Sequence, residues 1–98
     1  MATASSRIGL ISLLVHDYDS AIEYFVNKLG FTLTEDKTTR TNAGNPKRWV
    51  VIHRPGQNPS QATGILLAQA DGEEQKRAVG KQWAGRVGMF LNVDDFSS

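Results

Sequence analysis

The sequence predicts a small α+β domain built on a βαβββ module, and three observations support this expectation. The chain has 98 residues, which is enough for one modest core. Its apolar residues follow first a strand pattern, then a helical pattern, and then three further strand patterns. Near the end, GMFLNVDDFSS repeats the course of LISLLVHDYDSA, from an apolar strand through a valine to an acidic residue, an aromatic and a serine.

The first strand is expected over residues 8–15, because IGLISLLV is a nearly continuous apolar run, typical of a strand covered on both faces. A helix is expected over residues 18–29. Its apolar stripe recurs at helical spacing and consists of Ile22, Phe25, Val26 and Leu29. Gly30 is expected to end the helix in the left-handed conformation, with Phe31 packing back onto the last turn.

The rest of the chain completes this module and begins another. Alternating and β-branched residues predict strands over residues 31–39, 47–53 and 63–70. Asp71 and Glu74 have the spacing of a capping box, which predicts a surface helix in DGEEQKRAVGKQW. Residues 86–93 are expected to form a fifth strand. We therefore expect residues 1–70 to form the module. Residues 71–98 are expected to form a linking helix and the first strand of an incomplete second module, all within one compact domain.

Composition argues against several partners and chemistries. Eleven basic and ten acidic residues give a net charge of +1, which provides no electrostatic attraction to nucleic acid or to an anionic membrane. The sequence has no cysteine, which excludes disulfides, thiolate metal sites and cysteine nucleophiles. The apolar run after Arg7 is too short to span a bilayer and lacks a small-residue cleavage pattern, so we expect a cytoplasmic protein.

The two histidines are the first candidates for chemistry. His16 and Asp17 could form a metal or acid–base pair, but neighbouring residues at a strand end point to opposite sides. Asp17 can instead accept hydrogen bonds from the first helical turn, so we interpret the pair as a strand-to-helix connection.

His53 lies beside Arg54 at the end of the third strand. A catalytic base there is conceivable, but we favour a surface or rim histidine. The sequence has no G-x-S-x-G, P-loop or dinucleotide fingerprint, so we assign no catalytic residue and lean against an enzyme.

Three short motifs resemble the vicinal-oxygen-chelate superfamily, which includes glyoxalases, bleomycin-resistance proteins and extradiol dioxygenases. They are Val15-His16-Asp17, Ala21-Ile22-Glu23-Tyr24-Phe25 and Leu29-Gly30-Phe31. KRWVVIHRPG, TGILLAQA and GRVGMFLNVDDF continue in the same style, so the resemblance covers residues 7–96. It implies the βαβββ fold of the glyoxalase/bleomycin-resistance type, whose members usually form a cleft between two such modules.

The resemblance also indicates where a metal would be bound. Metal enzymes of the superfamily place ligands on the first and fourth strands of each module, and the three positions that can be matched here are Leu10, Leu66 and Gly88. Leucine and glycine side chains cannot coordinate a divalent cation. We therefore expect neither a metal nor another cofactor.

Strand alternation then predicts which side chains line the cleft. If position 10 faces the cleft, every second residue of that strand does so too, whereas Ile11, Leu13 and Val15 face the helix. The predicted ligand-binding residues are Leu10, Ser12, Leu14, Trp49, Leu66, Ala68, Phe90 and Asn92. This lining is mainly apolar, as in most small-molecule pockets. Trp49 and Trp83 could add aromatic walls to the cleft, or they could be core or interface residues, and the sequence favours neither interpretation.

The sequence therefore favours a metal-independent protein that binds an apolar or aromatic small molecule, as the bleomycin-resistance branch does. An alternative is a lactoylglutathione lyase-like enzyme, or another metal-dependent lyase, isomerase or dioxygenase, with a non-standard site or residues from a partner chain. A further alternative is an assembly-only fragment without a ligand.

We also expect a homodimer. A lone module leaves one sheet face in water, which is unfavourable by roughly 25 cal/mol per Å². A free fifth strand would leave its backbone groups unpaired, and exchange of this strand between chains would pair them. The second copy then replaces the missing module, with binding clefts at the joint.

Overall fold

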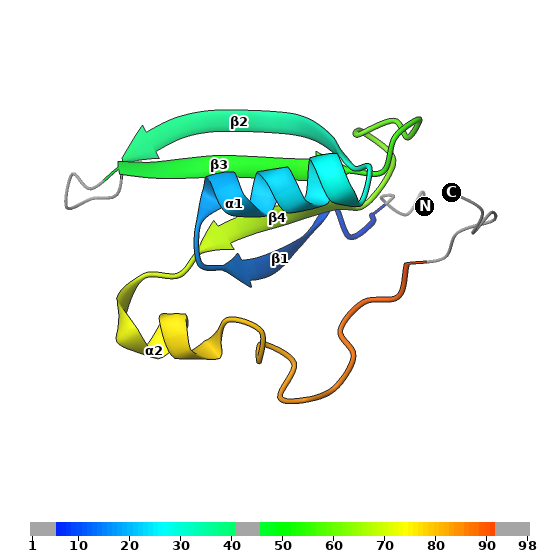
Figure 1. Ribbon diagram of the computed structural model, residues 1–98. Helices are drawn as coiled ribbons and strands as arrows, with labels where there is room; N and C mark the ends of the chain where they lie inside the picture. Colours follow the sequence, from blue (N-terminus) through cyan, green and yellow to red (C-terminus); the bar gives the residue numbers. More distant parts are fainter. Residues whose placement is uncertain (1–5, 41–45, 92–98) are drawn as a thin grey trace, which may run out of the picture.

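The computed structural model describes residues 6–40 and 46–91, which form one mixed sheet with helical segments (Figure 1). The elements in chain order are strand β1 (Leu10–Val15), helix α1 (Tyr18–Ile22), its π-helical continuation η1 (Glu23–Lys28), strands β2 (Thr32–Arg40), β3 (Pro46–His53) and β4 (Gly64–Gln69), and helix α2 (Gly72–Ala78). This order confirms the α+β module of βαβββ type that the sequence predicts.

The four strands lie in the order β1-β4-β3-β2. β1 runs parallel to β4, whereas β3 is antiparallel to both of its neighbours. A parallel pair needs a long crossover connection, and here the crossover consists of α1, η1 and the β2–β3 hairpin. The helix lies across one face of the sheet (Figure 1).

The core lies between this helix and the sheet. Its buried side chains are Val15, Tyr18, Ala21, Val50, Ile52 and Leu67. Leu13 and Ile65 pack against them from β1 and β4. Leu13 and Val15 therefore face the helix, as strand alternation predicts.

Both ends of the first helix follow the sequence signals. Asp17 is extended, and its Oδ2 accepts a hydrogen bond from the Ser20 amide at 2.8 Å, which confirms its role as the N-cap. Gly30 has a φ of 77°, as expected for the residue after the helix, and the Phe31 amide donates to the Phe25 carbonyl at 2.9 Å. The prediction of one regular α-helix is wrong from Glu23 onward, where the helix winds more widely as η1.

Helix α2 is shorter than predicted and is capped differently. The Asp71 side chain makes no capping bond, and Oε1 of Gln75 instead accepts the Asp71 amide hydrogen at 2.8 Å. The capping partner is therefore Gln75 and not Glu74. The helix ends at Ala78 because Val79 has a ψ of 129°, outside the helical range, and Gly80 has a φ of 80°.

The fifth strand is a wrong prediction for the part of it that the structure describes. Residues 86–91 have no regular structure and do not belong to the four-stranded sheet. A strand needs a neighbour for its backbone hydrogen bonds, and the described strands do not pair with this segment. The indole of Trp83 lies directly against Gly88. The last predicted residues of the strand, 92–93, lie outside the described ranges.

Candidate functional site

The face of the sheet away from α1, called the open face below, carries the predicted ligand-binding residues of β1 and β4. The strand register places Ser12 beside Leu66, and Leu66 beside Val51 of β3. Leu14 and Ala68 form the next row of the same face. The open face therefore carries mostly apolar side chains across three strands, of which Val51 is fully buried and Leu14, Leu66 and Ala68 are partly exposed.

A hollow lies where β3 and β4 separate before either strand ends. Their pairing stops at Val50–Leu67, although β3 begins at Pro46 and β4 continues to Gln69. The hollow has a volume of about 540 Å³. Its walls come from residues 47–49 of β3, residues 66–71 of β4 and the turn after it, and Ser12, Tyr18 and Gln75.

The walls combine an aromatic surface with polar groups. The Trp49 side chain is 40% exposed, so part of its indole surface is accessible. Leu66 and Ala68 add apolar surface, and Ser12 adds a hydroxyl. Gln75 contributes an amide whose Oε1 is already held by the Asp71 backbone, which leaves its N–H groups as donors. The turn after β4 and α2 make the hollow more polar than the strands alone predict.

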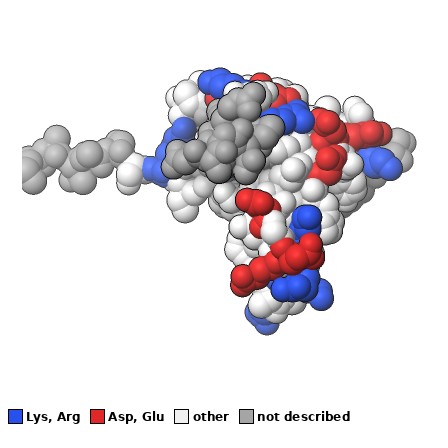
Figure 2. Space-filling view, turned by 90° about the vertical axis from the view of Figure 1, so that its left-hand side faces the viewer, with Lys and Arg blue, Asp and Glu red and all other residues white. Residues whose placement is uncertain are grey.

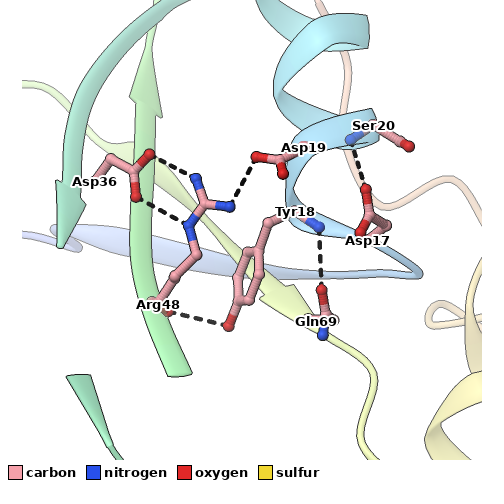
Figure 3. A network of polar contacts seen from close by, with 7 residues as sticks. All are labelled: Asp17, Tyr18, Asp19, Ser20, Asp36, Arg48 and Gln69. Carbon is pink, nitrogen blue, oxygen red and sulfur yellow. Dashed lines mark hydrogen bonds and ion pairs between the residues drawn. The ribbon is translucent and has the colours of Figure 1, made fainter. Parts of the chain in front are cut away.

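A polar network joins α1 to β3 beside the hollow (Figure 3). Nε and Nη2 of Arg48 donate to the Asp36 carboxylate at 3.1 and 2.6 Å, and Nη1 donates to Oδ1 of Asp19 at 2.7 Å. These two carboxylates raise the pKa of Arg48, so the guanidinium stays charged. Arg48 also lies over the Tyr18 ring, 5.3 Å from its centroid.

Tyr18 connects both sides of the gap between the strands. Its hydroxyl donates to the Arg48 carbonyl of β3 at 3.0 Å, and its amide donates to Oε1 of Gln69 on β4 at 3.2 Å (Figure 3). The side chain is buried at the edge of the core while it also lines the hollow. Core packing and the shape of the hollow therefore depend on the same residue.

The connection at His16–Asp17 has the geometry of a helix cap. The Ser20 amide and, next, the Ser20 side chain lower the pKa of Asp17, because these hydrogen bonds favour the charged carboxylate. His16 is exposed. The interpretation of this pair as a strand-to-helix connection agrees with both observations.

The prediction of a surface or rim position for His53 is wrong, because the side chain is 5% exposed. Its ring lies over Gly64, where a Cβ would come within 2.6 Å of the imidazole. The Thr34 hydroxyl donates to the Val51 carbonyl at 3.1 Å and lies 2.8 Å from Nδ1 of His53. Nε2 is buried and has no partner in the part of the chain that the structure describes.

The predicted ligand-binding residues fall into two groups. Ser12, Trp49, Leu66 and Ala68 meet at the hollow. The others do not line it. Leu14 borders a second, apolar groove of about 260 Å³ beside α1 and Val79, Leu10 lies on β1 away from the hollow, and Phe90 is 82% exposed in the irregular segment. Asn92 lies outside the described residues.

Eight of the residues that line the hollow were not predicted from the sequence, and they include Tyr18, Arg48, Asp71 and Gln75. Tyr18 and Arg48 reach it because β3 and β4 separate, a feature without a periodic signal. The capping pattern identified Asp71 as the start of a helix and not as a site residue. Gln75 directly follows Glu74, so the same capping pattern with its partner shifted by one residue indicates Gln75.

The residues at the superfamily's ligand positions do not fit a metal ion. Leu10 and Leu66 lie on the open face and Gly88 lies against Trp83, and none of the three has a side-chain atom that could coordinate a cation. Across residues 6–40 and 46–91, no group of three or more His, Asp or Glu side chains could hold a metal ion.

The charged side chains of α2 do not form a patch of one sign. Glu73 and Glu74 lie in its first turn and Lys76 and Arg77 in its last, and Figure 2 shows acidic and basic groups side by side at the lower end of the molecule. This arrangement complements the helix dipole. None of the helices in the described ranges has the length and apolarity needed to cross a membrane.

Two solved structures share this fold. UcmS2 superposes with a TM-score of 0.57 at 24% sequence identity, over 72% of this chain and 47% of UcmS2. TnmS3, an antibiotic binding protein from Streptomyces sp. CB03234, superposes with a TM-score of 0.51 at 26% identity, over 69% of this chain and 49% of TnmS3. The chain thus spans about half the length of each.

The sequence comparisons give the family. An uncharacterized protein of Shewanella frigidimarina (strain NCIMB 400) is 49% identical over 86 residues, which are 88% of this chain and 59% of that protein. The sequence profile of one family matches residues 7–98. The chain therefore belongs to the Glyoxalase/Bleomycin resistance protein/Dioxygenase superfamily.

Proposed function

We propose that this protein binds an apolar or aromatic small molecule without a metal ion, and that the hollow between β3 and β4 holds the ligand. The observation that carries the proposal is the partly exposed Trp49 indole on the wall of this hollow. Its volume of about 540 Å³ lies within the range of small-molecule pockets. An aromatic ring stacked on Trp49 would bury apolar surface on both sides of the contact.

Two further observations support binding without a metal. Leu10, Leu66 and Gly88 have no coordinating side-chain atoms at the positions where metal enzymes of the superfamily have ligands. TnmS3, which shares the fold, is an antibiotic binding protein. In this proposal Ser12, Leu66 and Ala68 contact the ligand together with Trp49, because all four line the hollow.

Calorimetric titration tests this proposal, with 2-naphthol as the first probe and a panel of aromatic antibiotics and metabolites after it. Trp49→Ala is expected to weaken binding about tenfold, since it removes the aromatic wall. Trp83→Ala is a matched control, because Trp83 is 39% exposed and does not line the hollow. Equal affinities of the two variants, or no heat of binding with any compound on the folded wild type, would contradict the proposal.

We also propose that the protein is a homodimer in which the second copy covers the open face. Several apolar side chains face water in the described chain, with Ile8 and Val87 each 67% exposed and Phe90 82% exposed. Burying such surface between copies is favourable.

Size-exclusion chromatography with light scattering at micromolar concentration tests the dimer. The expected mass is twice the 10.8 kDa of one chain. A folded species that stays at the mass of one chain over this concentration range would contradict it.

A further inference from the structure

The hollow lies where the β3–β4 register ends early, at Val50–Leu67, so that Trp49–Ala68 and Arg48–Gln69 are not paired. The Gly64 amide donates to the Gly9 carbonyl at 2.9 Å and the Ala70 amide to the Val15 carbonyl at 2.8 Å, so alternate residues of β4 point their backbone groups toward β1. Leu67 and Gln69 therefore point theirs toward β3.

The next pair that would exchange backbone hydrogen bonds is Arg48 and Gln69, because hydrogen-bonded and non-hydrogen-bonded pairs alternate in an antiparallel ladder. Leu67 is the register partner of Val50, so Val50 turns its N–H and C=O groups toward β4, and Arg48, two residues earlier, does the same. The register ends at Val50, however, although both strands continue. Arg48 and Gln69 are the last residues on either side that could extend it.

Tyr18 lies between the two residues of this missing pair. Its hydroxyl bonds to the Arg48 carbonyl, the acceptor that the Gln69 amide would otherwise use, and its own amide bonds to the Gln69 side chain. The Arg48 guanidinium packs over the ring, and Asp36 and Asp19 hold the guanidinium in place (Figure 3). The ring is buried, with 8% of its surface exposed.

We propose that Tyr18 is a positioning residue that keeps β3 and β4 apart and so creates the hollow. Its ring occupies the space that the Arg48–Gln69 pair needs, and its hydroxyl satisfies the carbonyl that this pair would have used. The role of Tyr18 in separating β3 and β4 does not depend on any ligand. The consequence for ligand binding rests on the proposed function.

Hydrogen exchange at single backbone amides, followed by NMR, tests the role of Tyr18 in the full chain. In the wild type, the Gln69 amide is expected to exchange at least about tenfold faster than the Leu67 amide, because the ladder ends between them. Tyr18→Leu removes the ring and lets the strands pair, so the Gln69 amide becomes about tenfold more protected. Tyr18→Phe frees the Arg48 carbonyl but keeps the ring in the space of the pair, so protection of Gln69 rises much less than in Tyr18→Leu.

Protection of Gln69 in the wild type equal to that of Leu67 would overturn the inference, and this measurement remains decisive if Tyr18→Leu does not fold. Unchanged exchange at Gln69 in a folded Tyr18→Leu variant would overturn it as well. Either result is independent of any ligand.

The consequence for ligand binding is tested by measuring the affinity of the same variants for 2-naphthol. Tyr18→Leu is expected to lose about tenfold or more in affinity because the hollow closes, while Tyr18→Phe stays within about threefold of the wild type. Absence of binding to the wild type contradicts the proposed function and leaves the exchange results valid. Equal affinity of Tyr18→Leu and the wild type contradicts the positioning role.

Discussion

At the scale of single residues, the cap at Asp17 links the stability of the first helix to pH. Hydrogen bonds from Ser20 lower the pKa of Asp17 in the folded protein below its ordinary value of 3.8. A group with a lowered folded pKa stabilises the fold above its unfolded pKa, and this contribution is lost as the pH falls through the folded pKa. We therefore expect the cap to stabilise the protein at neutral pH and to fail in acid.

Urea unfolding between about pH 2 and pH 6 tests this prediction. Asp17→Ala is expected to be less stable than the wild type at pH 6, because the Ser20 amide loses its acceptor. Asp17→Asn is the matched control, since asparagine caps helices without titrating, and it should lose less stability on acidification than the wild type does. The same loss on acidification in the wild type and in Asp17→Asn would contradict a role for this carboxylate.

The burial of the His53 ring depends on the absence of a side chain at Gly64, and no sequence pattern indicates this contact. The two residues are eleven positions apart, and His53 is buried because Gly64 has no side chain in the way of its ring. Gly64→Ala is expected to destabilise the protein by about 1–3 kcal/mol, as overpacking usually does. Gly9→Ala, where the nearest atom to an added Cβ is 3.9 Å away, should be nearly neutral.

Chemical denaturation of the single and double variants measures this packing effect. His53→Ala combined with Gly64→Ala should lose less stability than the sum of the two single changes, because the clash exists only while both groups are present. Additive losses would mean that the imidazole does not limit position 64.

At the scale of elements, β1 is an edge strand whose outer side is partly occupied. Oε1 of Gln82 accepts the Leu14 amide hydrogen at 2.6 Å, and its Nε2 donates to the Ser12 carbonyl at 2.8 Å. One side chain thus imitates part of a neighbouring strand at the edge of the sheet. A strand from a partner chain that pairs along this edge has to displace Gln82.

Gln82→Ala is therefore expected to tighten dimerisation about tenfold, since two hydrogen bonds no longer compete with the partner. Analytical ultracentrifugation of this variant beside Gln57→Ala, a change in an exposed loop, gives the comparison. An unchanged or weaker dimer in Gln82→Ala would place the dimer contact elsewhere.

The elements themselves could largely be predicted from the sequence, because strand and helix periodicity and the signals at Asp17 and Gly30 are local. The hollow could not be predicted, since the end of the β3–β4 ladder depends on Tyr18, a residue that looks like an ordinary core aromatic in the sequence. The prediction of the fifth strand was wrong for a related reason. Its residues have β propensity, but a strand also requires a neighbour to pair with.

At the scale of the whole molecule, the chain presents one complete module with a helix-covered face and an open face. It spans 59% of its Shewanella relative and about half of the two solved structures. The proposed site lies at one end of the sheet, where β3, β4 and the start of α2 meet. The described residues line two hollows that are candidates for a ligand site, the larger one at Trp49 and the apolar groove beside Leu14 and Val79.

NMR mapping of the backbone amides during a 2-naphthol titration shows whether an aromatic ligand binds in the larger hollow. We expect the largest shifts at Trp49, Ala68 and Gln75, which surround the hollow, and small shifts at Phe25 and Val79 in the other groove. Saturable shifts centred on Phe25 and Val79, or no saturable shift anywhere in the folded protein, would contradict binding in the larger hollow.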